Sequence, residues 1–142
     1  MKITRVMLGV VSLGALFWTS GCATLHKSDS ATLQGTWKGQ EIGSNAGGTR
    51  YFIFSGNTVE FQGANNDDWC RGTFTVREDT NPRQIVGIIT QCHQREYIGK
   101  TSRGIYELNG DTLTIAGYEP GTPNVPSSFD APGARHFVLQ RD

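Results

Sequence analysis

The sequence has little charge and no long hydrophobic run. Its 13 basic residues balance its 13 acidic residues, and charged residues make up only 18% of the chain. A nucleic-acid-binding domain would be expected to carry a clustered basic face. The N-terminal apolar stretch, Val6–Trp18, has 13 residues, whereas a membrane-spanning helix needs about 20. The composition therefore argues against nucleic acid as a partner and against a transmembrane helix as the anchor.

Recognisable catalytic motifs are absent as well. Three histidines are present, but no serine or cysteine nucleophile stands in a motif with them. Ser127 and Ser128 lack the glycine elbow that exposes a hydrolase nucleophile. The segment Asn65–Trp69 contains two carboxylates but lacks the ligand periodicity of a calcium loop. We therefore predict no enzyme activity, no metal and no cofactor.

The first 22 residues are arranged like a secretory signal, with basic residues, an apolar stretch and then small residues. The run Thr19-Ser20-Gly21-Cys22 resembles a bacterial lipobox, although Thr19 stands where Leu is usual. The resemblance implies cleavage before Cys22 and attachment of fatty acyl chains to it. The alternative is an ordinary secretory cut after Ala23, which would discard Cys22 and release the domain.

Under the lipoprotein interpretation, residues 1–21 are the signal peptide, residues 22–32 are the lipidated cysteine and a flexible polar tether, and residues 33–142 are the domain. Loss of the two basic residues of the signal leaves the mature chain with a net charge of −2. Ala23 follows Cys22 where Asp would resemble an inner-membrane retention signal. In a cell with two membranes, we therefore expect an anchor in the outer membrane, facing the periplasm.

Lipidation of Cys22 leaves Cys70 and Cys92 as a pair. A disulfide is the default expectation for such a pair in an oxidising compartment. A zinc site that added His93 would normally need a fourth ligand at close spacing, and none is present. We therefore predict a Cys70–Cys92 bond.

From Leu33 onward, short runs of alternating apolar residues are separated by Gly, Asn, Asp and Pro, a pattern typical of an all-β domain. No segment of the domain shows a helical period. Eight sequential strands with short turns favour an up-and-down antiparallel barrel, with a two-sheet sandwich as the alternative. The predicted strands are Gly35–Ile42, Arg50–Ser55, Thr58–Gln62, Cys70–Arg77, Ile85–Cys92, Arg103–Asn109, Thr112–Tyr118 and His136–Arg141.

Two hairpins have two-residue turns that fix their register. The predicted cross-strand pairs are Phe54 with Val59, Phe52 with Phe61, Leu108 with Leu113, and Tyr106 with Ile115.

A third hairpin turns around Asp79–Pro82. Pairing Val76 with Val86, and Phe74 with Ile88, makes one face apolar and places Cys70 opposite Cys92 on that face. Opposed Cα atoms in an antiparallel pair lie about 4.5–5.5 Å apart, which a disulfide tolerates.

Several motifs together resemble a family of small bacterial lipocalin-like domains of uncharacterised function. They are Leu33-Gln34-Gly35-Thr36-Trp37, the block Gly104–Leu113, the Pro126-x-x-Phe129 segment and the final strand with Arg141. In lipocalins proper, the Trp of the Gly-x-Trp motif closes the barrel floor under a basic residue of the last strand. The resemblance therefore implies a cation–π pair of Trp37 with Arg141, and it implies no catalytic residue.

The strand aromatics have two interpretations: they line a cavity for an apolar ligand, or they fill the barrel. Eight strands leave little lumen, so we expect a filled or nearly filled interior. The 17-residue connection Glu119–Arg135 contains four prolines, and we expect its Phe129 to fold back and plug the open end. The alternative is a rigid cover with no ligand beneath it. The strand aromatics concerned are Trp37, Phe52, Phe54, Phe61, Phe74 and Tyr106.

These observations predict a non-enzymatic binding module that is held at a membrane by lipid on Cys22. Its expected ligand is a small apolar or amphipathic molecule at the barrel mouth. The alternative is a protein-interaction or inhibitor module that acts through its loops and has a filled barrel.

Overall fold

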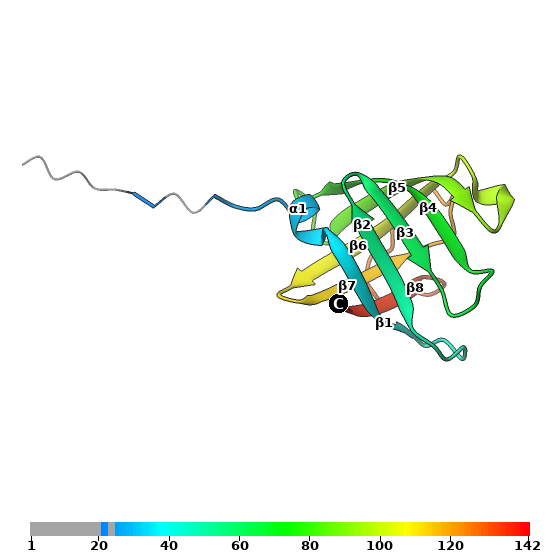
Figure 1. Ribbon diagram of the computed structural model, residues 1–142. Coiled ribbons are helices and arrows are strands. Elements are labelled where there is room, and N and C mark those ends of the chain that lie inside the picture. Colours follow the sequence, from blue (N-terminus) through cyan, green and yellow to red (C-terminus); the bar gives the residue numbers. More distant parts are fainter. Residues whose placement is uncertain (1–20, 23–24) are drawn as a thin grey trace, which may run out of the picture.

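The computed structural model describes residues 21–22 and 25–142 (Figure 1). Nearly all of the predicted signal peptide, residues 1–20, lies outside the described residues. Among the helices of the described part, none has the length and apolar character needed to cross a membrane.

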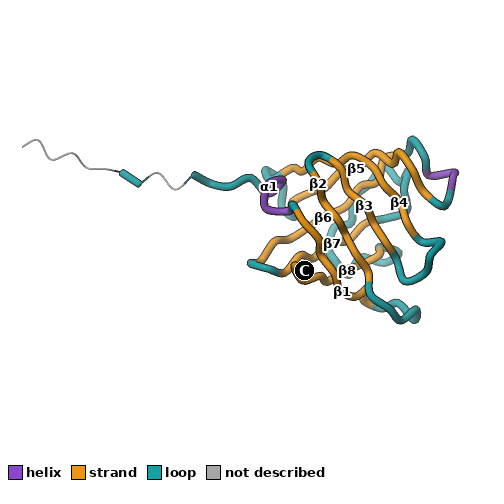
Figure 2. Tube along the Cα trace, viewed as in Figure 1, coloured by secondary structure: helices purple, strands orange, loops and turns teal. Residues whose placement is uncertain are grey.

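Eight antiparallel strands follow a one-turn helix and close into a barrel (Figure 2). Each strand pairs with the next along the chain, and β8 pairs with β1. The predicted up-and-down barrel is therefore confirmed, and the sandwich alternative is not. The elements are α1 (Asp29–Leu33), β1 (Gly35–Ile42), β2 (Arg50–Ser55), β3 (Thr58–Gln62), β4 (Trp69–Arg77), β5 (Arg83–Cys92), the 3₁₀ turn η1 (Arg95–Tyr97), β6 (Thr101–Asn109), β7 (Thr112–Gly117) and β8 (Arg135–Arg141).

The two ends of the barrel differ in their connections. One end, which we call the floor, carries α1 and the tight β2–β3 and β6–β7 turns, each with a glycine at positive φ: Gly56 at 61° and Gly110 at 59°. The other end, which we call the mouth, carries the longer connections 43–49, 63–68, 93–100 and 118–134. Figure 1 shows α1 at one end of the barrel and the β4–β5 side of the mouth at the other.

The two hairpins with short turns have the predicted register. Phe52 opposes Phe61 in the β2–β3 pair, and Tyr106 opposes Ile115 in the β6–β7 pair. Period-two alternation and turn length together determined both registers.

The predicted register of the β4–β5 hairpin is wrong by one residue over most of its length. Cys70 opposes Cys92, as predicted, but a bulge between Arg71 and Gly72 shifts the remaining pairs, so that Phe74 opposes Gly87 and Val76 opposes Ile85. A bulge adds one residue to one strand and reverses which residues face inward beyond it. Val86 and Ile88 therefore face outward, and the Ile88 side chain is 52% exposed.

The predicted flexible tether is also too long. Its last residues form α1, which begins after Ser28, whose Oγ accepts a hydrogen bond from the Ala31 backbone N–H. Leu33 is fully buried and Asp29 is 5% exposed. A single turn shows no helical period, and tertiary contacts, not intrinsic propensity, stabilise so short a helix.

The floor half of the barrel is a packed core. Arg141 lies over the Trp37 ring, 4.1 Å from its centroid, which is the arrangement that the lipocalin resemblance implied. The Trp37 indole N–H donates to the Leu33 carbonyl over 2.8 Å and so attaches α1 to the core. The buried residues of this core are Leu33, Trp37, Phe54, Phe74, Tyr106, Leu113, Ile115, Phe137 and Leu139.

The long β7–β8 connection lies against the outside of the barrel. Ile105 and Ala116 oppose each other on the outward face of β6 and β7, yet both are fully buried. Ala116 also opposes His136, whose ring lies 5.9 Å from that of Phe129 in the connection. The prediction that Phe129 plugs the mouth is therefore wrong, because its ring packs on an outward-facing residue of β8.

Candidate ligand-binding cavity

The mouth half of the barrel contains a cavity of about 420 Å³. Ligand sites for small molecules typically occupy about 300–1,000 Å³ and are mostly apolar. The expectation of a filled interior is therefore wrong for this half of the barrel, although it holds for the floor. The apolar side chains lining the cavity include Phe52, Phe61, Phe74, Ile85, Ile115 and Phe137.

Glycines on three neighbouring strands leave this space empty. Gly87, Gly104 and Gly117 all line the cavity, and Gly104 opposes Gly117 directly. Each lies two residues from an inward-facing side chain of its own strand, so each stands where a side chain would otherwise fill the lumen. We call Gly87, Gly104 and Gly117 the glycine wall.

The members of the glycine wall differ in how much space surrounds them. A Cβ atom added at Gly104 would lie 2.7 Å from the Ala116 carbonyl oxygen, so the backbone itself requires glycine there. A Cβ atom at Gly87 would approach only the Thr73 carbonyl oxygen, at 3.4 Å. A side chain at position 87 would therefore extend into the cavity without displacing backbone.

Phenyl rings form the opposite side. The ring centroid of Phe52 lies 5.1 Å from that of Phe61 and 5.2 Å from that of Phe137, and these last two are 5.4 Å apart. The rings are tilted or edge to face, which are favourable aromatic geometries. In the closed order of eight strands, β2 and β3 lie across the barrel from β6 and β7, so the rings of Phe52 and Phe61 face the glycine wall. Phe137 is on β8, beside β7.

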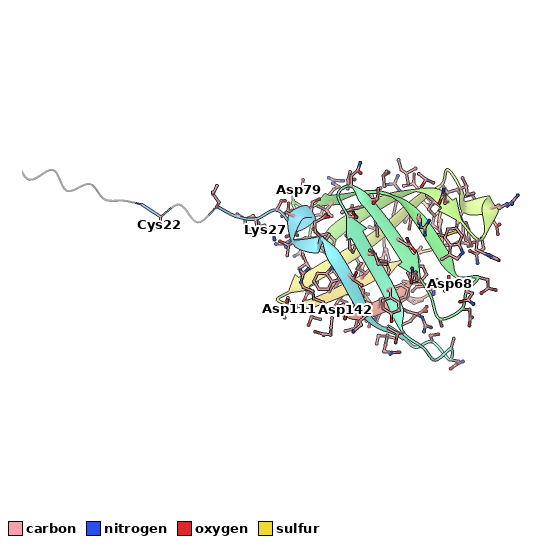
Figure 3. The ribbon with its side chains drawn as sticks, viewed as in Figure 1. Cys22, Lys27, Asp68, Asp79, Asp111 and Asp142 are labelled. Carbon is pink, nitrogen blue, oxygen red and sulfur yellow. A yellow bond between two sulfur atoms is a disulfide. The ribbon has the colours of Figure 1, made fainter. Side chains whose placement is uncertain are left out.

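Arg135 covers the phenyl rings at the mouth. Its guanidinium carbon lies 5.0 Å from the Phe61 centroid and 5.2 Å from the Phe137 centroid. Its Nε and Nη2 donate to the two carboxylate oxygens of Glu41 over 2.8 and 2.9 Å. Its Nη2 also donates to Asp68 over 3.0 Å. Figure 3 shows Asp68 at the mouth, away from Asp79 and Asp111 at the floor.

A second arginine completes this ionic cluster. The Arg50 side chain is 2% exposed and donates to Glu41 Oε2 over 3.2 Å. It also donates to the carbonyls of Ala46, Gly47 and Gly48, and so orders the β1–β2 connection. The Arg135 hydrogen bond, aided by Arg50, lowers the pKa of the Glu41 carboxyl below its usual value. Two cations and two anions thus neutralise one another in the cluster of Glu41, Arg50, Asp68 and Arg135.

The other side of the mouth is fixed by a disulfide and a hydrogen bond. The predicted Cys70–Cys92 bond is confirmed, and it joins the start of β4 to the end of β5. The Tyr97 hydroxyl donates to Glu119 over 2.6 Å, which ties η1 to the β7–β8 connection. That hydrogen bond raises the pKa of Tyr97. Because the two cysteines are bonded to each other, they supply no thiolates for the alternative zinc site with His93.

The predicted aromatic residues divide between the two halves of the barrel. Trp37, Phe54 and Tyr106 are almost completely buried in the floor core. Phe52, Phe61 and Phe74 line the cavity. The Cys22 side chain is exposed and takes no part in the disulfide.

One group of metal-ligating residue types lies near α1 in the described part of the chain. His26, Asp29 and Glu78 offer ligand atoms within 4.8 Å of one another. Asp29 Oδ2, however, already accepts hydrogen bonds from Tyr106 (2.6 Å) and Arg83 (2.8 Å). The observed role of Asp29 is therefore to hold α1 on the floor.

Sequence reasoning missed the glycine wall and the ionic cluster. Alternation could have indicated the ionic cluster, because Glu41, Arg50 and Arg135 occupy inward positions of their strands. The one-residue error in the β4–β5 register assigned Gly87 to the outer face and so hid it.

Comparison of the chain with protein-family models, with curated proteins and with solved structures gave no match.

Proposed function

We propose that this protein is a non-enzymatic binding module that holds a small apolar molecule in the mouth half of its barrel. The cavity of about 420 Å³ carries this proposal. Its walls combine phenyl rings, aliphatic side chains and glycine backbone with polar and charged residues, among them Arg71, Arg103, Glu119 and Arg135. An apolar molecule that contacts the apolar part of this wall is removed from water. Such burial contributes about 25 cal/mol per Å² of apolar surface.

The mouth has the features of a preformed site. The ionic cluster, the disulfide and the Tyr97–Glu119 hydrogen bond hold the surrounding connections in place. A site that is ordered before its ligand arrives loses less conformational entropy on binding.

The proposal includes a membrane anchor through acyl chains on Cys22, motivated by the lipobox-like run that ends there. Replacing Cys22 with Ser is expected to move the protein from the membrane fraction to the soluble fraction. A Ser28→Ala variant, which leaves the lipobox-like run intact, is the control. Retention of the Cys22→Ser protein in the membrane pellet would show that something else anchors it.

Native mass spectrometry tests the binding function. The protein purified from its own cells under mild conditions is expected to carry a co-purifying lipid-like mass that is lost on denaturation. Repeated absence of such a mass would instead favour a protein-interaction or inhibitor module that acts through its loops.

A further inference from the structure

We propose that the ligand of the cavity is an uncharged, flat ring compound. This inference rests on the proposed binding function and names the class of molecule that the walls accept. It follows from two observations: the neutrality of the ionic cluster at the mouth and the lack of side chains on the glycine wall.

The charge of the ligand follows from the ionic cluster. Arg135 is the cation that covers the phenyl rings, and two carboxylates already occupy its donors. An acidic head group would have to displace Asp68 or Glu41, while a basic one would meet two carboxylates that are already paired. Either charge would be desolvated without a free counter-charge in this cluster, and that is costly. The cavity lining also includes Arg71, which donates to Glu60, and Glu119, which accepts from Tyr97. Arg103 stands at an outward position of β6, next to the inward-facing Gly104.

The shape of the ligand follows from the walls. Along Gly87, Gly104 and Gly117 the surface of the lumen is backbone, so a molecule can approach the sheet closely. Phenyl rings lie across the barrel. A rigid flat molecule contacts both walls and loses no internal rotations on binding, whereas a flexible acyl chain loses many.

Displacement of the fluorescent probe 1-aminoanthracene from the purified protein tests both properties. Three competitors are compared: anthracene-9-methanol, anthracene-9-carboxylate and decan-1-ol. The first is expected to displace the probe at concentrations at least about tenfold lower than the other two, equivalent to about 1.4 kcal/mol. In an Asp68→Asn variant, which leaves Arg135 with one carboxylate partner, the carboxylate competitor should improve relative to the methanol.

Each result bears on a different part of the inference. Equal or better displacement by the carboxylate overturns the claim that the ligand is uncharged. Equal or better displacement by decan-1-ol overturns the claim that it is flat. If none of these compounds binds but a lipid-like mass co-purifies, the inference fails and the proposed binding function stands. If neither is observed, both fail.

A second inference, carried by α1, concerns orientation. We infer that the anchored domain presents its mouth away from its own membrane, so that ligand arrives from the aqueous side. This second inference depends on the acyl anchor proposed at Cys22. The chain leaves the barrel at the floor, where three hydrogen bonds hold α1. Tyr106 and Arg83 donate to the Asp29 carboxylate, and Arg141 donates to the Thr32 carbonyl. Figure 1 shows the chain leaving α1 on the side away from the mouth.

The length of the connecting segment limits the alternatives. From Cys22 to Asp29 the chain spans at most about 24 Å when fully extended. The nine-residue strand β4 is about 30 Å long, or about 23 Å along the barrel axis at a tilt near 40°. Bringing the mouth to the bilayer would therefore require the segment to lie fully extended along the barrel wall, which loses nearly all of its conformational entropy.

Energy transfer to the membrane surface measures this orientation. In acylated protein with the Cys70–Cys92 bond intact, an introduced cysteine is the sole free thiol. A donor dye is placed at the mouth with Asn66→Cys or at the floor with Asp111→Cys, and the vesicles carry an acceptor lipid. The floor dye is expected to transfer more energy than the mouth dye. Greater transfer from the mouth dye, in protein shown by mass to be acylated, would overturn the orientation alone. Protein without acyl mass would overturn the anchor and the orientation together.

Discussion

Arg141 lies over the Trp37 ring at 4.1 Å and also donates to the carbonyls of Gln34 (2.9 Å) and Thr32 (2.7 Å). One side chain of the last strand thus joins the first strand of the barrel to the segment that covers its floor.

Replacing Arg141 with Met is therefore expected to destabilise the domain by about 2–3 kcal/mol, through the loss of two charge-assisted hydrogen bonds and a cation–π contact. Arg141→Lys should lose about 1–2 kcal/mol, because an ammonium lacks the planar fork that reaches both carbonyls. Urea unfolding followed by circular dichroism measures the change. Arg77→Ala on the exposed surface is the control, and an equal loss there would contradict the assigned role.

Asp29 and Tyr106 form a buried hydrogen bond 77 residues apart in sequence. Burial, together with this bond, raises the pKa of the Tyr106 hydroxyl. Asp29→Ala should cost about 2–3 kcal/mol, since it leaves the hydroxyl buried without that partner. In the double variant with Tyr106→Phe, the loss should be clearly smaller than the sum of the single losses. Additive losses, measured by urea unfolding, would show that the two residues act independently.

The free energy of unfolding should fall in acid because Glu41 becomes protonated. Its pKa is lowered in the folded state by Arg135 and Arg50, so the unfolded state binds the proton more readily. The stabilisation of the folded state by ionised Glu41 is fully present above the pKa of about 4.3 that this carboxyl has in the unfolded chain. It is lost as the pH falls through the lower pKa of the folded state. Glu41→Gln should lower stability at pH 7 by about 2–3 kcal/mol, and its stability should decline less between pH 6 and pH 3. Glu107→Gln is the exposed control, and parallel pH profiles of Glu41→Gln and the native protein would exclude Glu41 as the source of the acid sensitivity.

The Cys70–Cys92 bond encloses a loop with a sequence separation of 22. A loop of that length gives about 3 kcal/mol in the chain-entropy model, but a hairpin already restricts the reduced chain, so we expect about 1–3 kcal/mol. Reduced protein should unfold at a temperature several degrees lower than oxidised protein. Thiol titration of unfolded, unreduced Cys22→Ser protein should find no reactive thiol, whereas two thiols would show that the bond is absent.

The fold could be predicted from the sequence because local signals and the global structure agree. Alternation along each strand, with glycine turns at Gly56 and Gly110, was enough for the barrel and two registers. The β4–β5 error arose because the bulge after Arg71 leaves no clear signal in a run where Ile85, Val86, Ile88 and Ile89 are all apolar. With four such residues, either register gives an apolar inner face.

The site was harder to predict because it is defined by residues without side chains and by contacts distant in sequence. A glycine in a strand indicates a bulge, a bend or a cavity equally well, and the β5–β6 register is needed to show that Gly87 lies on the same inner face as Gly104 and Gly117. Similarly, Arg135 and Glu41 are 94 residues apart. α1 was missed for the same reason, since its stability comes from Tyr106, Arg83 and Arg141.

Binding of 1-aminoanthracene to two matched variants tests the cavity most directly. Gly87→Leu adds a side chain that extends into the cavity, while Thr75→Leu adds the same side chain at an exposed position of β4. Both variants should remain folded by circular dichroism. If the cavity is the binding site, Gly87→Leu should weaken binding at least about tenfold, or about 1.4 kcal/mol, and Thr75→Leu should leave it unchanged. If a folded Gly87→Leu protein binds 1-aminoanthracene as tightly as the native chain does, that result would contradict a ligand site inside the barrel.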